Sequence, residues 1–186
     1  SSEVDLDCLH RSACKLRHDM AKPSHLYLIA LGSNVRTVSD GAPRRVLENA
    51  IEVLEDLGLL FHAVAPIIAT PPIGPSQRKF ANGAAVIETH REPDELLQLL
   101  KATEQIFGRK SHGQRWRARV LDLDIVLWEG GIWESHSLII PHPEFRIRDF
   151  VLRPASAIAG DWRDPITNLS LAQLYARLTK PRPVPR

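Results

Sequence analysis

Several short apolar runs along the chain have the pattern of buried strands. The first, residues 25–34, ends in a Gly-Ser-Asn turn that leads into a loop. Two more runs, 59–70 and 81–89, are separated by a proline-rich segment. In the fourth, residues 120–128, apolar and acidic residues alternate, which is typical of a strand with one face in a core. We therefore predict four strands.

Amphipathic segments between these runs predict helices. Residues 43–58 carry apolar side chains at helical spacing, with proline at the start and glycine at the end. Residues 92–108 repeat this pattern and begin with acidic residues, which the helix dipole favours. Two shorter helices are expected at 148–158 and 170–178. The order βαββαβ predicts an α+β, ferredoxin-like fold: an antiparallel sheet with helices on one face and a C-terminal helical extension.

Length and composition fit one domain. The chain has 186 residues, of which 44% are hydrophobic, enough for one core and too few for two well-packed ones. We expect residues 25–179 to form this domain, with tails at 1–24 and 180–186. Cys8 and Cys14 both lie in the first tail, so a disulfide between them would not cross-link the domain. We therefore interpret both cysteines as having no structural role in it.

The charge balance restricts the partners. The chain has 24 Lys+Arg against 22 Asp+Glu, a net charge of +2, which argues against binding nucleic acid through bulk charge. No apolar run approaches the ~20 residues that cross a bilayer, and the first 25 residues lack the apolar core of a signal peptide. We expect a cytoplasmic monomer with neither a nucleic acid nor a membrane as partner.

Two carboxylates share one face of the last predicted strand. Alternation places Asp122 and Asp124 about 6.5–7 Å apart, while Leu121, Leu123 and Ile125 point into the core. Neighbouring carboxylates repel unless a cation lies between them, and hard oxygen ligands suit Mg²⁺ that is shared with substrate phosphates. A solvated polar strand face is the alternative interpretation.

A cationic segment precedes this acidic strand directly. Residues 109–119 contain five Arg or Lys and no acid. Guanidinium groups match phosphoryl oxygens geometrically, so the segment and the carboxylates together indicate a site for a triphosphate with bound Mg²⁺. A solvated charged loop would explain the segment alone.

Two further motifs have chemistry of their own. The segment 70–75, Thr-Pro-Pro-Ile-Gly-Pro, precedes Phe80 and Asn82, which could form a slot for a flat heterocycle: the ring would stack on Phe80 while Asn82 reads its edge. His142 stands between two prolines, followed by Arg148, and either side chain could contact a phosphate. Taken alone, each of these residues has an ordinary structural explanation.

Together, the motifs resemble the 6-hydroxymethyl-7,8-dihydropterin pyrophosphokinase family from Leu26 to Leu178. They occur in the family's order: Ala-Leu-Gly-Ser-Asn at 30–34, the segment 70–75 with Phe80 and Asn82, Gly108-Arg109, Arg115-Trp116, Arg119 with Leu-Asp-Leu-Asp-Ile at 121–125, Pro141-His142-Pro143, and Arg148-Asp149-Phe150. The resemblance implies an enzyme of folate biosynthesis that transfers pyrophosphate from ATP to the hydroxymethyl group of the pterin and releases AMP.

The resemblance also implies residue roles. Asp122 and Asp124 would hold two Mg²⁺ ions and, with Arg109 and Arg119, form the catalytic group. The residues implied at the nucleotide are Glu104, Arg109, Arg115, Trp116, Arg119, Ile125, His142, Pro143 and Arg148. Those implied at the pterin are Thr70, Pro71, Ile73, Phe80, Asn82 and Phe150, with the two phenylalanines sandwiching the ring.

Two other functions are compatible with parts of the pattern. The basic segment and Trp116 could belong to a ferredoxin-like RNA-binding module, but Asp122 and Asp124 would repel RNA phosphates. A non-catalytic sensing domain would bind a pterin or a nucleotide and release no AMP. Assaying AMP release with the pterin, ATP and Mg²⁺ separates the catalytic function from both.

The chain departs from the family pattern at positions that bear on ATP affinity. Ser111 stands where many members have a second arginine, and Ser137 where some have another. Arg117-Ala118 replaces the usual Gly-Pro, so our hypothesis is that Arg117 restores part of the lost charge. Accordingly, Arg117→Ala should raise the KM for ATP in a steady-state assay. An unchanged KM would refute the hypothesis.

Overall fold

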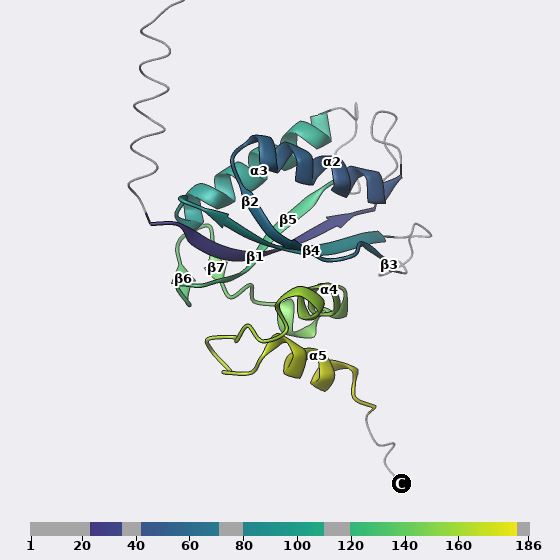
Figure 1. The fold of residues 1–186 in the computed structure, drawn as a ribbon, viewed down its shortest axis with the longest axis vertical. Helices are drawn as coiled ribbons and strands as arrows, with labels where there is room; N and C mark the ends of the chain where they lie inside the picture. The colour runs from purple at the N-terminus through teal and green to yellow at the C-terminus, as the bar shows by residue number, and fades with distance from the viewer. Residues whose placement is uncertain (1–22, 35–41, 71–79, 110–119, 182–186) are drawn as a thin grey trace, which may run out of the picture.

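The computed structural model describes residues 23–34, 42–70, 80–109 and 120–181, in which a βαββαβ core is followed by a helical extension (Figure 1). The core elements are β1 (His25–Ser33), α2 (Pro43–Asp56), β2 (Leu60–Val64), β3 (Ile68–Thr70), β4 (Phe80–Thr89), α3 (Pro93–Arg109) and β5 (Asp122–Trp128). Then come β6 (Trp133–Glu134), β7 (Ile139–Ile140), the 3-10 helix η1 (Phe145–Ile147), α4 (Asp149–Ala159) and α5 (Leu171–Thr179).

The sheet has the strand order β2-β4-β1-β5, with antiparallel neighbours throughout, which confirms the ferredoxin-like prediction. The single strand expected over 59–70 is instead two strands, β2 and β3, which both pair with β4. The Ala65 N–H still donates to the Ala84 carbonyl, but Pro66, which has no N–H, follows and the regular strand stops.

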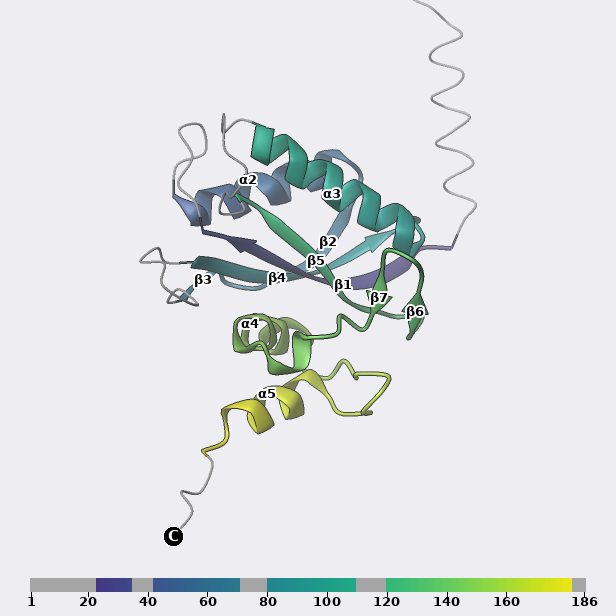
Figure 2. The same cartoon turned by 180° about the vertical axis from the view of Figure 1, so that it is seen from behind.

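Helices cover both faces of the sheet (Figures 1 and 2). Alternation along β1 sends Ile29 and Leu31 into the core beneath α2 and α3, and Leu28 and Ala30 into a second core beneath α4. The predicted C-terminal extension therefore closes the face that α2 and α3 leave open. Helix α5 packs on α4 and η1.

A bulge in β5 connects the sheet to the extension. Leu28 pairs with Leu127 but Ile29 pairs with Ile125, so Val126 is an extra residue on β5. The Val126 carbonyl accepts a hydrogen bond of 3.0 Å from the His142 N–H. The bulge thus anchors the chain that follows β7 beside the acidic end of β5.

The small β6–β7 hairpin was not predicted, because its two-residue strands are too short to produce a periodic pattern. It is tied to the start of α3 by Asp94, which accepts hydrogen bonds from the Ser135 hydroxyl (2.7 Å) and the Trp133 indole (3.2 Å). Ser137, one of the departures from the family pattern, lies 3.4 Å from the same carboxylate. Among the described helices, none has the length and apolarity to span a bilayer.

A buried ion pair fixes η1 to the segment between α4 and α5. Asp164 is fully buried and accepts two hydrogen bonds from the Arg146 guanidinium, at 2.8 and 2.7 Å. The Thr167 hydroxyl and the Ile166 N–H also donate to it. Burial by itself would raise the pKa of Asp164, but these hydrogen bonds outweigh it, and the net effect lowers the pKa below its ordinary value.

The ion pair predicts a pH-dependent contribution to stability. Asp164→Asn leaves Arg146 without its counter-charge, so the free energy of unfolding at pH 7 should fall by about 3 kcal/mol. Because the folded-state pKa of Asp164 is lowered, its contribution is present above the unfolded pKa of about 3.9 and is lost as the pH falls through the folded value.

Urea denaturation from pH 7 down to pH 3 tests this prediction. The stability difference between wild type and Asp164→Asn should narrow below about pH 4. The exposed Asp161→Asn is the matched control. Equal stability of wild type and Asp164→Asn at pH 7 would contradict the structural role.

Candidate functional site

A cavity of about 560 Å³ lies between the sheet and the η1–α4 segment, at the end of β1. Strands β1, β4 and β5 line it on one side, with η1 and α4 on the other. Of the predicted site residues, it brings together Thr70, Phe80, Asn82, Asp122, Asp124, Arg148 and Phe150. The cavity is therefore lined by residues from both the predicted nucleotide site and the predicted pterin site.

The sheet register explains the floor of this cavity. On β1, Gly32 pairs with Asn82 of β4 on one side and with Asp122 of β5 on the other. A Cβ at Gly32 would lie 3.5 Å from Asn82 Oδ1 and 3.8 Å from Asp122 Cβ. Two residues earlier, Ala30 lies beside Asp124 in the same way. Because the central strand has only small side chains here, the amide and the carboxylates border a hollow.

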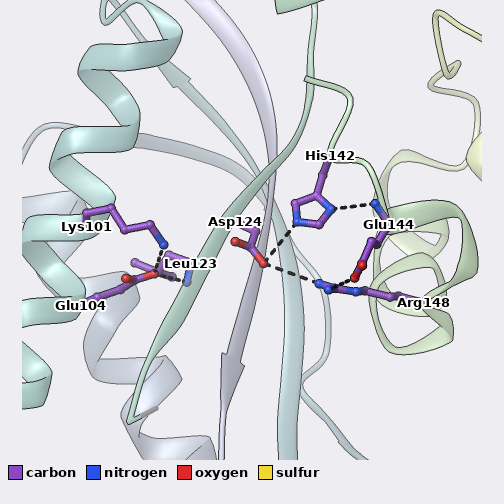
Figure 3. A network of polar contacts seen from close by, with 7 residues as sticks. All are labelled: Lys101, Glu104, Leu123, Asp124, His142, Glu144 and Arg148. Atoms are coloured by element: carbon purple, nitrogen blue, oxygen red, sulfur yellow. Dashed lines mark hydrogen bonds and ion pairs between the residues drawn. The ribbon is translucent and has the colours of Figure 1, made fainter. Parts of the chain in front are cut away.

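The two aspartates alternate with core residues as predicted. Leu123 and Ile125 are 0% and 2% exposed, whereas the Asp124 side chain is 31% exposed. Its Oδ2 lies 3.9 Å from His142 Nε2 and 4.0 Å from Arg148 Nη1 (Figure 3). Positive charge and hydrogen-bond donors therefore approach the acidic strand from the extension.

The donor set at this end of β5 fits Mg²⁺. Within the described parts of the chain, no group of three or more His, Cys, Asp or Glu side chains has a geometry that could hold a metal. Magnesium keeps several waters and is commonly bound through one or two carboxylates together with substrate phosphates. Asp122 and Asp124, which both line the cavity, are two carboxylates of the kind that such a site requires.

The orientation of His142 is fixed from two directions. Its main chain is held by the Val126 carbonyl, and its ring Nδ1 accepts a hydrogen bond of 3.2 Å from the Glu144 N–H. An Nδ1 that accepts carries no proton, so in the neutral ring the proton is on Nε2, the atom that faces Asp124. His142 therefore presents a donor toward the cavity side of β5.

Arg148 links the polar and aromatic parts of the cavity. Its guanidinium forms an ion pair with Glu144, approaches Asp124, and lies 5.9 Å from the centroid of the Phe150 ring. The side chain is 30% exposed, so the guanidinium can reach a ligand. Glu144, which was not predicted from the sequence, also lines the cavity. Its four-residue spacing from Arg148 was the available signal.

Asn82 is held in place at the opposite side of the hollow. The residue is 6% exposed, and its Nδ2 donates a hydrogen bond of 2.7 Å to the Thr70 hydroxyl. Phe80 and Phe150 are both half-buried and line the same cavity from β4 and α4. The described part of the site therefore combines two aromatic rings with a fixed amide.

Four predicted nucleotide residues lie outside the lining of the cavity: His142, described above, and Ile125, Pro143 and Glu104. The Ile125 side chain is in the core, so a contact with a ligand would use its main chain. Pro143 is exposed next to His142. Glu104 accepts hydrogen bonds from the Leu123 N–H and from Lys101, each at 2.8 Å.

Several predicted site residues lie in segments that the structure does not describe. The structure gives the main chain of Arg109 but not its side chain. Outside the described residues lie Pro71, Ile73, Ser111, Arg115, Trp116, Arg117, Ala118 and Arg119.

Comparisons with known proteins agree with the resemblance seen in the motifs. The family model described as 7,8-dihydro-6-hydroxymethylpterin-pyrophosphokinase (HPPK) matches residues 28–160. A Synechocystis protein named 2-amino-4-hydroxy-6-hydroxymethyldihydropteridine pyrophosphokinase is 33% identical over 160 residues, covering 86% of this chain and 80% of its own. A protein of the same name from Pseudomonas aeruginosa is 37% identical over 139 residues, covering 74% and 82%.

A solved structure supports the fold. The crystal structure of wild-type Plasmodium falciparum HPPK-DHPS superposes with a TM-score of 0.66 over 84% of this chain and 41% of that chain. The sequence identity is 13%, so this likeness bears on the fold alone.

The Thr70–Asn82 hydrogen bond gives a prediction that requires no ligand. Thr70→Val removes the acceptor and leaves a buried amide donor unsatisfied, so the free energy of unfolding should fall by about 1–3 kcal/mol. Thr70→Ser keeps the hydroxyl and serves as the control. Urea denaturation measures both, and a Thr70→Val protein as stable as wild type would show that the bond contributes nothing.

Proposed function

The chain belongs to the 7,8-dihydro-6-hydroxymethylpterin-pyrophosphokinase family, and on this premise we propose how its residues perform the reaction. It is a pyrophosphokinase of folate biosynthesis, which transfers pyrophosphate from ATP to 6-hydroxymethyl-7,8-dihydropterin. One observation supports the assignment of residues to the two substrates. Asn82, Gly32 and Asp122 are paired side by side on three neighbouring strands, so the fixed amide and a carboxylate border the same cavity with only a glycine between them.

The pterin would lie between Phe80 and Phe150. Flat heterocycles stack on aromatic rings, and both rings line the cavity. Asn82 Nδ2 already donates a hydrogen bond to the Thr70 hydroxyl. Oδ1 is therefore the atom that would accept a hydrogen bond from an N–H on the edge of the pterin ring. Pro71 and Ile73, which follow Thr70 in the chain, are proposed to complete this edge.

The ATP phosphates would lie toward the acidic end of β5. Asp122 and Asp124 would hold two Mg²⁺ ions, which when bound neutralise phosphate charge. Arg148 and the Nε2–H of His142 would donate to phosphoryl oxygens from the extension. The remaining proposed nucleotide contacts are Arg109, Arg115, Trp116, Arg119, Pro143 and the main chain of Ile125.

The proposed reaction is an in-line displacement at the β-phosphorus. The pterin hydroxymethyl oxygen attacks and releases its proton to solvent, while the bond from the β-phosphorus to the oxygen bridging to the α-phosphate breaks, so AMP leaves with the electron pair. We assign no general base, because positioning and charge neutralisation are the main requirements of such transfers. The chain's contribution is to hold the pterin beside the acidic strand and to direct donors at the phosphates.

The test is AMP formation from 6-hydroxymethyl-7,8-dihydropterin, ATP and Mg²⁺ by the purified protein. Asp122→Asn and Asp124→Asn should each lower kcat by at least about 100-fold, since each removes a charge that the phosphates and their cations require.

The fold should survive in both variants, as judged by circular dichroism, because neither side chain is in the core. The exposed Asp56→Asn is the matched control and should keep full activity. Full activity of Asp122→Asn or Asp124→Asn would remove the metal assignment. Binding of the pterin or of ATP by the wild type without AMP release would instead indicate a sensing domain.

A further inference from the structure

Glu104 is fixed to the strand that carries the two aspartates. Its Oε1 accepts a hydrogen bond of 2.8 Å from the N–H of Leu123, the residue between Asp122 and Asp124. We propose that Glu104 is a positioning residue, whose carboxylate holds the edge of β5 so that both aspartates keep the placement they need for Mg²⁺. The part of this proposal that concerns Mg²⁺ rests on the proposed function.

The topology of the sheet explains why Leu123 needs an outside partner. In the described sheet, β5 is an edge strand whose neighbour is β1. In an antiparallel pair, residues alternate between those whose N–H and carbonyl face the neighbouring strand and those whose groups face away. The Leu123 N–H faces away, toward α3, so Asp122 and Asp124 are the residues whose main chains face Gly32 and Ala30.

Burial makes this hydrogen bond consequential. Leu123 is fully buried, so water does not replace a missing acceptor for its N–H, and an unpaired buried donor is unfavourable. The bond also lies at the start of β5, because the strand begins at Asp122 and Leu123 is its second residue. Glu104 therefore secures the outer edge of β5 where the pair of carboxylates begins.

The surroundings of Glu104 favour this role over a direct contact with the nucleotide. Figure 3 shows Glu104 and Lys101 on the α3 side of β5, with His142 and Arg148 on the opposite side. The Glu104 side chain is 17% exposed, it also accepts from Lys101, and it does not line the cavity. Its carboxylate thus acts on the aspartates through the main chain of β5.

The proposal predicts that the Mg²⁺ dependence is sensitive to the length of the side chain at position 104 and not to its charge. Glu104→Gln keeps a carbonyl acceptor at the same distance and loses the charge. Glu104→Asp keeps the charge and is one methylene too short. Outer-shell partners of metal ligands typically change metal affinity 10- to 100-fold when removed. Glu104→Asp and Glu104→Ala should therefore raise the Mg²⁺ concentration for half-maximal AMP formation by about tenfold or more, while Glu104→Gln stays within about threefold of wild type.

A second readout does not depend on activity. In the protein without nucleotide, hydrogen exchange of the Leu123 amide, followed by NMR, should accelerate at least about tenfold in Glu104→Asp and Glu104→Ala and remain near wild type in Glu104→Gln. Lys101→Met removes the other partner of Glu104 and is the matched control, with both readouts unchanged. A general loss of packing would accelerate core amides such as that of Ile87 as well, and these should stay protected.

Three results would overturn the proposal. The first is an unchanged Mg²⁺ dependence in a folded Glu104→Asp or Glu104→Ala protein. The second is a Glu104→Gln protein as impaired as Glu104→Ala while Glu104→Asp is normal, since the charge would then be the essential feature. The third is unaltered exchange of the Leu123 amide in Glu104→Asp. A wild type that forms no AMP would refute the proposed function instead, and the amide-exchange comparison would still test the hydrogen bond.

Discussion

The antiparallel pairing of β1 with both β4 and β5 is the constraint on which the site depends. One register places Gly32 between Asn82 and Asp122. A slip of either pair by one residue would turn the amide or the carboxylate to the opposite face of the sheet, into the apolar core under α2 and α3. The register is therefore enforced by burial of Ile29 and Leu31 on that face, although the chemistry occurs on the other.

The helical extension supplies the second wall, and its position depends on polar contacts that the sheet does not provide. The bulge at Val126 holds the His142 main chain, and the buried pair of Arg146 and Asp164 fixes η1. Arg148 follows η1 directly. A structural ion pair thus lies two residues from a guanidinium proposed to contact phosphate, which couples stability of the extension to geometry of the site.

The acidic end of β5 is supported from three sides. β1 pairs with it on one edge, Glu104 of α3 holds the other, and His142 and Arg148 approach Asp124 from the extension. Two like charges on one strand face repel, and a protein that keeps them together must restrain the backbone that carries them. In a family whose reaction depends mainly on positioning, such restraint is a direct contribution to activity.

The sequence by itself determined the order of elements and the alternation of Asp122 and Asp124 with core residues, because both follow from local periodicity. It also contained the motifs from which the family could be recognised. The bulge at Val126 and the hydrogen bond from Leu123 to Glu104 were decided only by tertiary structure. Each depends on a partner or a register that the local pattern does not contain, since a hydrogen-bond acceptor nineteen residues away leaves no mark on hydrophobic periodicity.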